Sequence, residues 1–225
     1  QRQMCIRDST YPDLEPPFIC LVASGGHSHI IEVLDYDRFR LLGHTRDDAA
    51  GEAFDKVARA LGLPYPGGPE LEKLALEGDP MKYPFHSALN SSAEEADFSF
   101  SGIKTAVVNL MHNAAQKGET LSRADIAASF QRAVCDTLTL KAVHAAKEHG
   151  FNTLALAGGV SANRALRSSL ARACEEQGIR FCCPDFRYCT DNAAMIACAG
   201  HYALMAGELS GLDLNAAPEL PLVQR

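Results

Sequence analysis

Long apolar runs are missing from this sequence of 225 residues. Its longest apolar stretches, such as Phe18 to Ala23 and Thr153 to Ala157, have the length of a β-strand and are far too short to span a membrane as a helix. A secretory signal, internal repeats and low-complexity tracts are missing too. With 47% hydrophobic and 22% charged residues, the composition is that of a globular protein with one large domain or two small lobes. We expect no contact with a membrane.

The cysteines lack the Cys-x-x-Cys spacing of zinc sites and redox motifs, and most of them fall within apolar segments. Free thiols fit the reducing cytoplasm best, so we expect a cytoplasmic protein. The eight cysteines are Cys5, Cys20, Cys135, Cys174, Cys182, Cys183, Cys189 and Cys198.

Positive charge is also scarce. The sequence holds 21 lysines and arginines against 28 aspartates and glutamates, which gives a formal net charge of −7. A protein that coats nucleic acid by bulk electrostatics needs the opposite balance, although one local basic patch is compatible with this composition. The sequence also lacks His-Glu-x-x-His and any motif that pairs a nucleophile with its base, which disfavours a peptidase.

The most informative stretch that is present runs from Thr153 to Leu166, TLALAGGVSANRAL. An apolar strand leads into Gly158 and Gly159 and then into a helical segment, so the backbone turns where side chains are absent and amides are free. Such amides at a helix N-terminus can bind a phosphate or a ribose hydroxyl. The alternative is that the two glycines only let the strand and the helix pack closely.

A second glycine pair lies in FICLVASGGHSHIIEV, where two apolar runs flank Ser24, Gly25 and Gly26. This pattern predicts a β-hairpin, with a third strand from Arg40 to His44. The glycines can be turn residues alone. In the functional interpretation, the turn places the amides of Gly25 and Gly26 and the Ser24 hydroxyl beside a phosphate.

The segment from Asp47 to Leu61 predicts an amphipathic helix with an acidic face that includes Glu52 and Asp55. This face is either solvated or binds a ligand. We expect Gly62 to cap the helix. The stiff loop from Pro64 to Pro69 is expected to hold in place whatever group Asp55 contacts.

A further helix is expected from Pro69 to Glu77, followed by a loop-rich segment over residues 78–97. Phe98 and Phe100 are expected to anchor the core. Lys104, near a helix start, either reaches an anion or remains a surface lysine.

Ser122 and Asp125 form a capping box for a long helix that reaches to about His149. After the central glycines, Ser161 or Asn163 can cap the next helix.

Near the C-terminus, Ile179 to Cys183 predict a strand, and Thr190 is expected to cap a final helix with Asp191 in its first turn. An acidic residue at that position can simply complement the helix dipole, which is worth ~0.3–1 kcal/mol.

Taken in order, the segments SGGHSH, DDAAGEAFDKVARALGLPYPGGP, DFSFSGIKT, AGGVSANRALR and CTDNAAMIACAG resemble the TsaD family, the tRNA adenosine threonylcarbamoyltransferases once called glycoproteases. The resemblance runs from about Pro17 to about Gly207. It implies an α/β fold like actin, sugar kinases and Hsp70, a ribonuclease H-like lobe with a mixed sheet flanked by helices. It also implies transfer of threonylcarbamoyl from threonylcarbamoyl-AMP to N6 of the adenosine beside the anticodon in tRNAs reading ANN codons (t6A formation).

The resemblance also implies site residues, although no catalytic one. Asp191 resembles the carboxylate of a site for one divalent metal, which would be iron(II) or else zinc. From the residues themselves we add the amides of Gly158 and Gly159 to the adenylate site. The residues that resemble the family's adenylate-binding positions are Val22, Ala23, Ser24, Gly25, Gly26, Asp55, Gly68 and Asn163.

The sequence departs from the family in one respect. Family members carry an N-terminal lobe with a His-x-x-x-His pair as further metal ligands, and no two histidines here have that spacing. The sequence therefore looks like the C-terminal part of such a protein. We expect a disordered or artefactual lead over residues 1–16, the family domain over residues 17–208 and a tail over residues 209–225.

Expected partners, again by resemblance, are tRNA and the TsaB-like and TsaE-like proteins of t6A synthesis. Two alternatives remain open. A kinase or ATPase of the same superfamily would share the glycine turns, and a fragment without catalytic activity would only bind partners.

Overall fold

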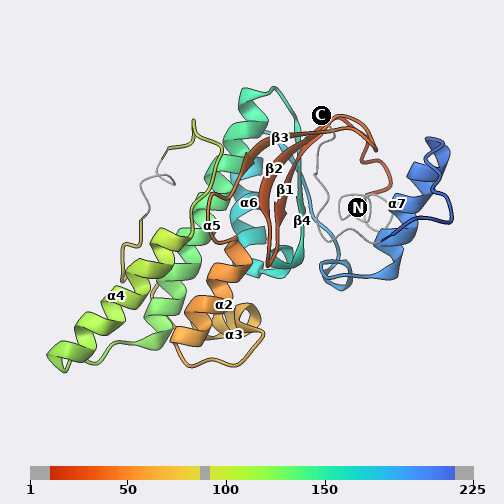
Figure 1. Cartoon of the computed structure of the whole chain (residues 1–225). Coiled ribbons are helices and arrows are strands. Elements are labelled where there is room, and N and C mark those ends of the chain that lie inside the picture. Colours follow the sequence, from red (N-terminus) through yellow and green to blue (C-terminus); the bar gives the residue numbers. More distant parts are fainter. Residues whose placement is uncertain (1–10, 87–91, 216–225) are drawn as a thin grey trace.

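The computed structural model describes residues 11–86 and 92–215, and a five-stranded sheet forms its centre (Figure 1). The strand order is β3-β2-β1-β4-β5, with antiparallel pairing among β1, β2 and β3 and parallel pairing of β4 with β1 and β5. The sheet is therefore mixed, as predicted. The strands are β1 (Phe18–Ala23), β2 (Ser28–Val33), β3 (Phe39–His44), β4 (Thr153–Ala157) and β5 (Arg180–Cys182).

Both faces of the central strand β1 are buried, which explains its continuous apolar sequence. Ile19 and Leu21 belong to the larger core, whereas Phe18 and Cys20 belong to a smaller core on the other face. The predicted hairpin is confirmed, because β1 pairs with β2 across the turn at residues 24–27.

The helices lie on both sides of this sheet. Figure 1 shows α5 and α6 against one face, α7 on the opposite side, and α2, α3 and α4 beyond one end of the strands. The helices are α2 (Ala50–Ala60), α3 (Gly67–Ala75), α4 (Ser101–Lys117), α5 (Arg123–Glu148), α6 (Arg164–Glu176) and α7 (Ala193–Met205), with short 3-10 helices η2 (Gly159–Ala162) and η3 (Phe186–Tyr188).

Several local predictions are confirmed by the helix ends. The Ser122 hydroxyl accepts a hydrogen bond from the Asp125 amide at the start of α5. Gly150 follows the end of α5 with a φ of 74°, a left-handed conformation that glycine adopts without strain. The rings of Phe98 and Phe100 are fully buried in the larger core.

The helix predicted from Asp47 begins later, at Ala50. Asp47 lies outside it because its carboxylate accepts hydrogen bonds from the amides of Phe100 (2.8 Å) and Ser101 (3.1 Å). Asp47 therefore fixes the approach to α4 rather than the start of α2.

The cap predicted for the last helix is wrong. Asn192, not Thr190, caps α7, because its side chain accepts a hydrogen bond from the Met195 amide at 2.9 Å. Asp191 consequently lies before the helix and outside its first turn.

The predicted lead does not extend to residue 16. Leu14 is only 2% exposed and packs in the smaller core, and Asp13 forms an ion pair with Arg180 at 2.8 Å. Residues 11–16 therefore belong to the fold, while residues 1–10 lie outside the described part. The division into a domain and a tail stays a prediction, with residues 216–225 also outside the described part.

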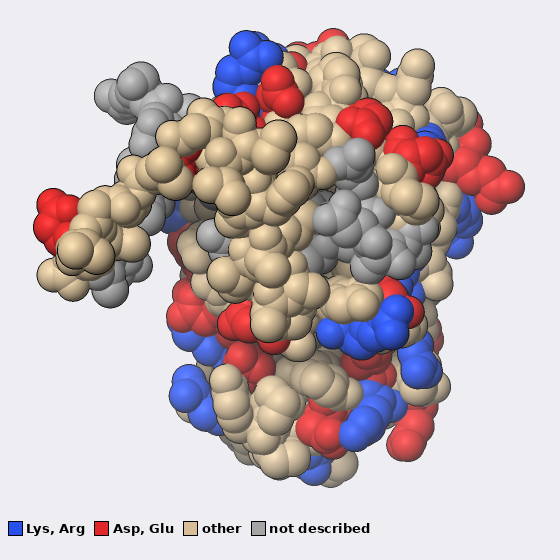
Figure 2. Space-filling model, turned by 90° about the vertical axis from the view of Figure 1, so that its right-hand side faces the viewer, with Lys and Arg blue, Asp and Glu red and all other residues tan. Residues whose placement is uncertain are grey.

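Helix α7 is apolar yet poorly covered. Its side of the molecule presents mainly uncharged residues (Figure 2). Within it, Ile196, Leu204 and Met205 are exposed and Met195 is buried. Among the described helices, none has both the length and the apolar composition that crossing a membrane requires.

Candidate functional site

The parallel strands β1 and β4 end side by side, and a cavity of about 240 Å³ opens near the turns that follow them. Ligands of α/β proteins commonly bind beyond the carboxyl ends of parallel strands. The cavity draws on the hairpin turn, α2, the start of α3 and the η2 segment. Its lining comprises Gly25, Gly51, Phe54, Asp55, Pro66, Gly68, Pro69, Glu72, Gly159, Val160, Ala162 and Asn163.

The structure thus brings five of the predicted site residues to one cavity, although they come from distant segments. These five are Gly25, Asp55, Gly68, Gly159 and Asn163.

The glycines around the cavity fall into two kinds. A Cβ atom added at Gly25, Gly68 or Gly159 would meet nothing within 4 Å, so their backbones face open space. A Cβ at Gly158 would lie 2.2 Å from the Ala23 carbonyl oxygen, and Gly158 has a φ of 95°. Gly158 therefore allows close packing, which is the alternative to ligand binding that the sequence leaves open for both glycines. Gly159 is open to a ligand.

Asp55 is held in place by the first turn of α3. Its Oδ1 atom accepts hydrogen bonds from the amides of Gly67 (2.8 Å) and Gly68 (3.2 Å). Among the described residues, none donates a hydrogen bond to its Oδ2 atom. Asp55 is therefore not a solvated surface charge, and one of its oxygens remains available to a ligand hydroxyl.

Asn163 lines the cavity, but the protein itself uses most of its hydrogen-bonding capacity. Its Oδ1 atom caps α6 by accepting from the Leu166 amide at 2.9 Å, and its Nδ2 atom donates to Gln131 at 2.9 Å. The second hydrogen on Nδ2 is left for a ligand.

Three predicted residues of the hairpin do not present side chains to the cavity. The Ser24 hydroxyl accepts from the His27 amide at 3.1 Å, so it stabilises the turn rather than facing a phosphate. Ala23 is fully buried in the larger core, and Val22 packs on the smaller one. Gly26 lies beside Gly25 in the turn, and a Cβ there would also meet open space.

Sequence reasoning missed two residues of this region. Glu72 lines the cavity and accepts from the Arg164 amide at 2.6 Å, which ties α3 to α6. Gln131 is buried beside Phe130 and Val134 and holds Asn163. A glutamine on the apolar face of a long helix was the available signal, because buried amides normally have partners.

Lys104 does not reach an anion from solution. Its Nζ atom pairs with Asp48 at 2.9 Å, and Lys56 pairs with the same carboxylate at 2.7 Å. Burial alone would raise the pKa of Asp48, but the hydrogen bonds from the two lysines outweigh burial and hold its pKa at about 2. This cluster connects the start of α2 to α4.

Asp191 does not sit in a metal site formed by the described residues. Within residues 11–86 and 92–215, no group of three or more histidine, cysteine, aspartate or glutamate side chains has a geometry that could hold a metal ion. A single carboxylate does not fit iron(II) or zinc, which take three or more protein ligands.

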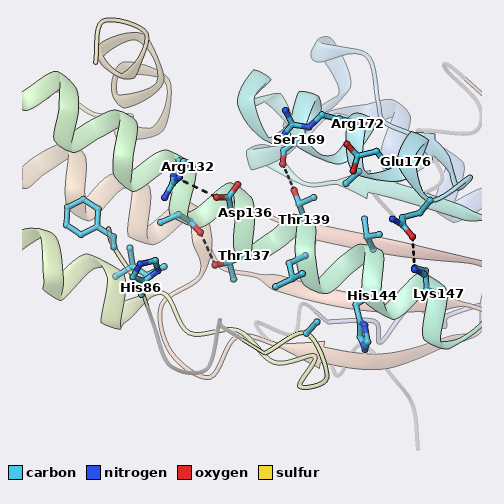
Figure 3. Close-up of a pocket in the computed structure, with 18 residues that line it drawn as sticks. His86, Arg132, Asp136, Thr137, Thr139, His144, Lys147, Ser169, Arg172 and Glu176 are labelled. Carbon is cyan, nitrogen blue, oxygen red and sulfur yellow. Dashed lines mark hydrogen bonds and ion pairs between the residues drawn. The ribbon is translucent and has the colours of Figure 1, made fainter. Parts of the chain in front are cut away.

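A larger cavity, about 600 Å³, lies between α5 and α6, and none of the predicted site residues lines it (Figure 3). The hydroxyls of Thr139 and Ser169 bond each other there at 3.0 Å, and Lys147 bonds Gln177 at 2.6 Å. No glycine is among the described residues that line it, so the smaller cavity is the candidate site for a nucleotide.

Two solved structures share this fold. Full-length HypF, crystallised with phosphate and nucleotide, superposes with a TM-score of 0.69 at 16% identity, covering 93% of this chain and 36% of HypF. The activator of 2-hydroxyisocaproyl-CoA dehydratase from Clostridium difficile gives a TM-score of 0.51 at 15% identity, covering 95% of this chain and 70% of the activator. At these identities the likeness concerns the fold alone, and it confirms the predicted class of actin-like and sugar kinase-like α/β folds.

Sequence comparison goes further. Relatives described as tRNA N6-adenosine threonylcarbamoyltransferase include one from Caldicellulosiruptor saccharolyticus, 51% identical over 216 residues, and one from Clostridium botulinum strain 657, 50% identical over 215 residues. Each alignment covers 96% of this chain and 63% of the relative, so the chain spans less than two thirds of their length. The model of the TsaD family, tRNA N6-adenosine threonylcarbamoyltransferase, matches residues 3–198, and this chain therefore belongs to that transferase family.

Proposed function

We propose that the chain provides the adenylate site of an enzyme that transfers threonylcarbamoyl from threonylcarbamoyl-AMP to N6 of the adenosine beside the anticodon in tRNAs reading ANN codons. The observation that carries the proposal is the cavity itself. Gly25, Gly68 and Gly159, where an added Cβ would meet open space, line the same cavity as Asp55, whose Oδ2 atom accepts no hydrogen bond from the described residues.

The two kinds of polar group suit the two parts of an adenylate. Backbone amides donate hydrogen bonds, so the glycine turns would hold the phosphate. A carboxylate oxygen accepts them, so Asp55 Oδ2 would take a ribose hydroxyl. The backbone around Gly159 can approach the ligand closely because no side chain intervenes there.

The transfer itself needs positioning more than a covalent relay. The N6 amine attacks the carbamoyl carbon of threonylcarbamoyl-AMP, the bond from that carbon to the phosphate oxygen breaks, AMP leaves, and the amine loses a proton. Holding both reactants in line supplies much of the rate of such a reaction. Val22, Ala23, Ser24 and Gly158 would contribute by shaping the two turns rather than by side-chain contacts.

We further propose Asp191 as one ligand of a divalent metal, iron(II) or zinc, whose remaining ligands would have to come from outside the described residues. The proposed partners are tRNA and the TsaB-like and TsaE-like proteins, acting in the cytoplasm.

The test is a transfer assay with the chain joined to the remaining part of a family member. Synthetic threonylcarbamoyl-AMP and an unmodified transcript of an ANN-reading tRNA are the substrates, and nucleoside mass spectrometry detects t6A. We expect modified adenosine, and a matched tRNA that reads no ANN codon as the control should stay unmodified. ATP hydrolysis without t6A would favour a kinase or ATPase instead. Adenylate binding without transfer would favour a binding module.

A further inference from the structure

A groove of about 480 Å³ shares one lining residue, Asp55, with the proposed adenylate cavity. It runs between one face of α2 and the loop that connects α2 to α3. Asp55 lines both the cavity and the groove, so the two spaces adjoin. The lining of this acceptor groove, as we name it, comprises Glu52, Asp55, Lys56, Arg59, Leu63, Pro64, Tyr65 and Gly67.

Tyr65 is the most unusual residue of the acceptor groove, because its side chain is 86% exposed. Its loop is nevertheless fixed. Pro64 and Pro66 flank the tyrosine, and a Cβ at Gly67 would lie 2.5 Å from the Ala58 Cβ, so the loop packs directly on α2. An exposed aromatic ring on a fixed backbone offers a flat apolar surface, and tyrosine has few rotatable bonds to order on binding.

Arg59 is the cation of the acceptor groove that forms no ion pair with the described residues. Lys56 is already paired with Asp48 (2.7 Å) and Glu52 (2.8 Å), and backbone amides hold Asp55. In the part of the chain that the structure describes, no acidic side chain pairs with the exposed Arg59. Arg59 lies one helical turn from Asp55 on the same face of α2, which is ~6 Å along the helix axis.

An aromatic platform beside a free arginine suits a single-stranded nucleic acid. Unpaired bases stack on tyrosine rings, and guanidinium groups bind backbone phosphates. A protein surface would be a less natural occupant, because this groove combines one exposed ring with a free cation rather than an apolar patch.

We propose that the acceptor groove holds the tRNA acceptor, with Tyr65 stacked on a base next to the reacting adenosine and Arg59 on a backbone phosphate. This inference rests on the proposed function and assigns its RNA subsite. Tyr65 and Arg59 would be positioning residues, since neither touches the reacting atoms.

The experiment measures the affinity of this chain for an unmodified ANN-reading tRNA over a series of potassium chloride concentrations. We expect Tyr65→Ala to weaken binding about ten-fold, because stacking of one base is lost, and Tyr65→Trp to bind as the unmodified chain does. Leu76→Ala is the matched control, since Leu76 is 79% exposed but lines neither space.

Arg59→Ala should lower the slope of log affinity against log salt by about 0.7, the value for one phosphate contact on a single strand. Arg172→Ala, which removes an exposed arginine from the larger cavity, should leave that slope unchanged. Affinity for AMP should be the same in all of these variants.

Several outcomes would overturn the inference. One is that the unmodified chain binds no tRNA, and another is that Tyr65→Ala binds tRNA as tightly as the unmodified chain does. The others are that Tyr65→Ala loses as much affinity for duplex DNA of the same length as for tRNA, or loses affinity for a TsaB-like protein alone. Failure of AMP to bind the unmodified chain would instead remove the proposed function, and the Tyr65 result would still decide the RNA subsite.

Discussion

Asp55 shows how one side chain can be both structural and available to a ligand. One carboxylate oxygen accepts hydrogen bonds from the amides of Gly67 and Gly68, and the other accepts none from the described residues, while Asp55 lines the cavity. From the sequence, Asp55 is either a solvated surface charge or a ligand contact. The structure adds a third role, in which the carboxylate caps the start of α3.

Substitution of Asp55 should therefore affect binding and stability separately. We expect Asp55→Ala to weaken threonylcarbamoyl-AMP binding by roughly one to two decades, since loss of an acceptor that the bound ligand buries costs ~1–3 kcal/mol. Asp55→Asn keeps an oxygen that can accept from the two amides. It should therefore lower the free energy of unfolding less than Asp55→Ala does. Isothermal titration and urea denaturation measure the two effects. Glu175→Ala on the exposed face of α6 is the control, and equal behaviour of Asp55 and Glu175 variants would contradict the assignment.

Gly158 and Gly159 are adjacent but should respond differently to substitution. Gly159→Val places a side chain in the open cavity, so we expect loss of adenylate binding with an almost unchanged circular-dichroism spectrum. Gly158→Ala brings a methyl group against the Ala23 carbonyl and requires a positive φ, so the melting temperature should fall instead. Unchanged adenylate affinity in Gly159→Val would remove this turn from the site.

At the scale of helices and strands, the sequence predicted what depends on local chemistry. The hairpin, the glycine after α5 and the Ser122 cap follow from turn and capping preferences that act over a few residues. The partners of Asp47 and Lys104 could not be predicted, because they lie more than 50 positions away in sequence. The same limit explains the cavity. The sequence named five of its residues one by one, but it did not indicate that the amides of Gly67 and Gly68 hold Asp55 or that Gln131 holds Asn163.

The ion cluster that connects α2 to α4 should make stability depend on acid. The folded-state pKa of Asp48 is about 2, below the unfolded value of ~3.9, so its contribution is present above pH ~4 and is lost as the pH falls toward 2. We expect Asp48→Asn to lower the free energy of unfolding at pH 7 by ~1–2 kcal/mol after allowance for screening. Urea denaturation at pH 7 and near pH 2 should show that difference shrinking, and a constant difference would exclude the ion cluster as its cause.

For the molecule as a whole, the question is what Asp191 does. A lone carboxylate binds iron(II) or zinc weakly, so this chain by itself should hold little metal and modify no tRNA. Joined to a family segment that carries a His-x-x-x-His pair, it should acquire stoichiometric metal, and Asp191→Ala should then remove both metal and transfer. Elemental analysis of the joined protein is the measurement. Full occupancy after Asp191→Ala would reject the ligand role.

The shared position of Asp55 has a consequence for turnover. The carboxylate lines the cavity proposed for the adenylate and also holds the amide next to the loop that presents Tyr65. A ligand that donates a hydrogen bond to one oxygen of Asp55 changes the hydrogen bonds by which the other oxygen holds this loop. Binding of one ligand then changes the affinity for the other, and the coupling is reciprocal. Departure of AMP after transfer would therefore change the affinity for the modified tRNA by the same factor by which that tRNA changes the affinity for AMP.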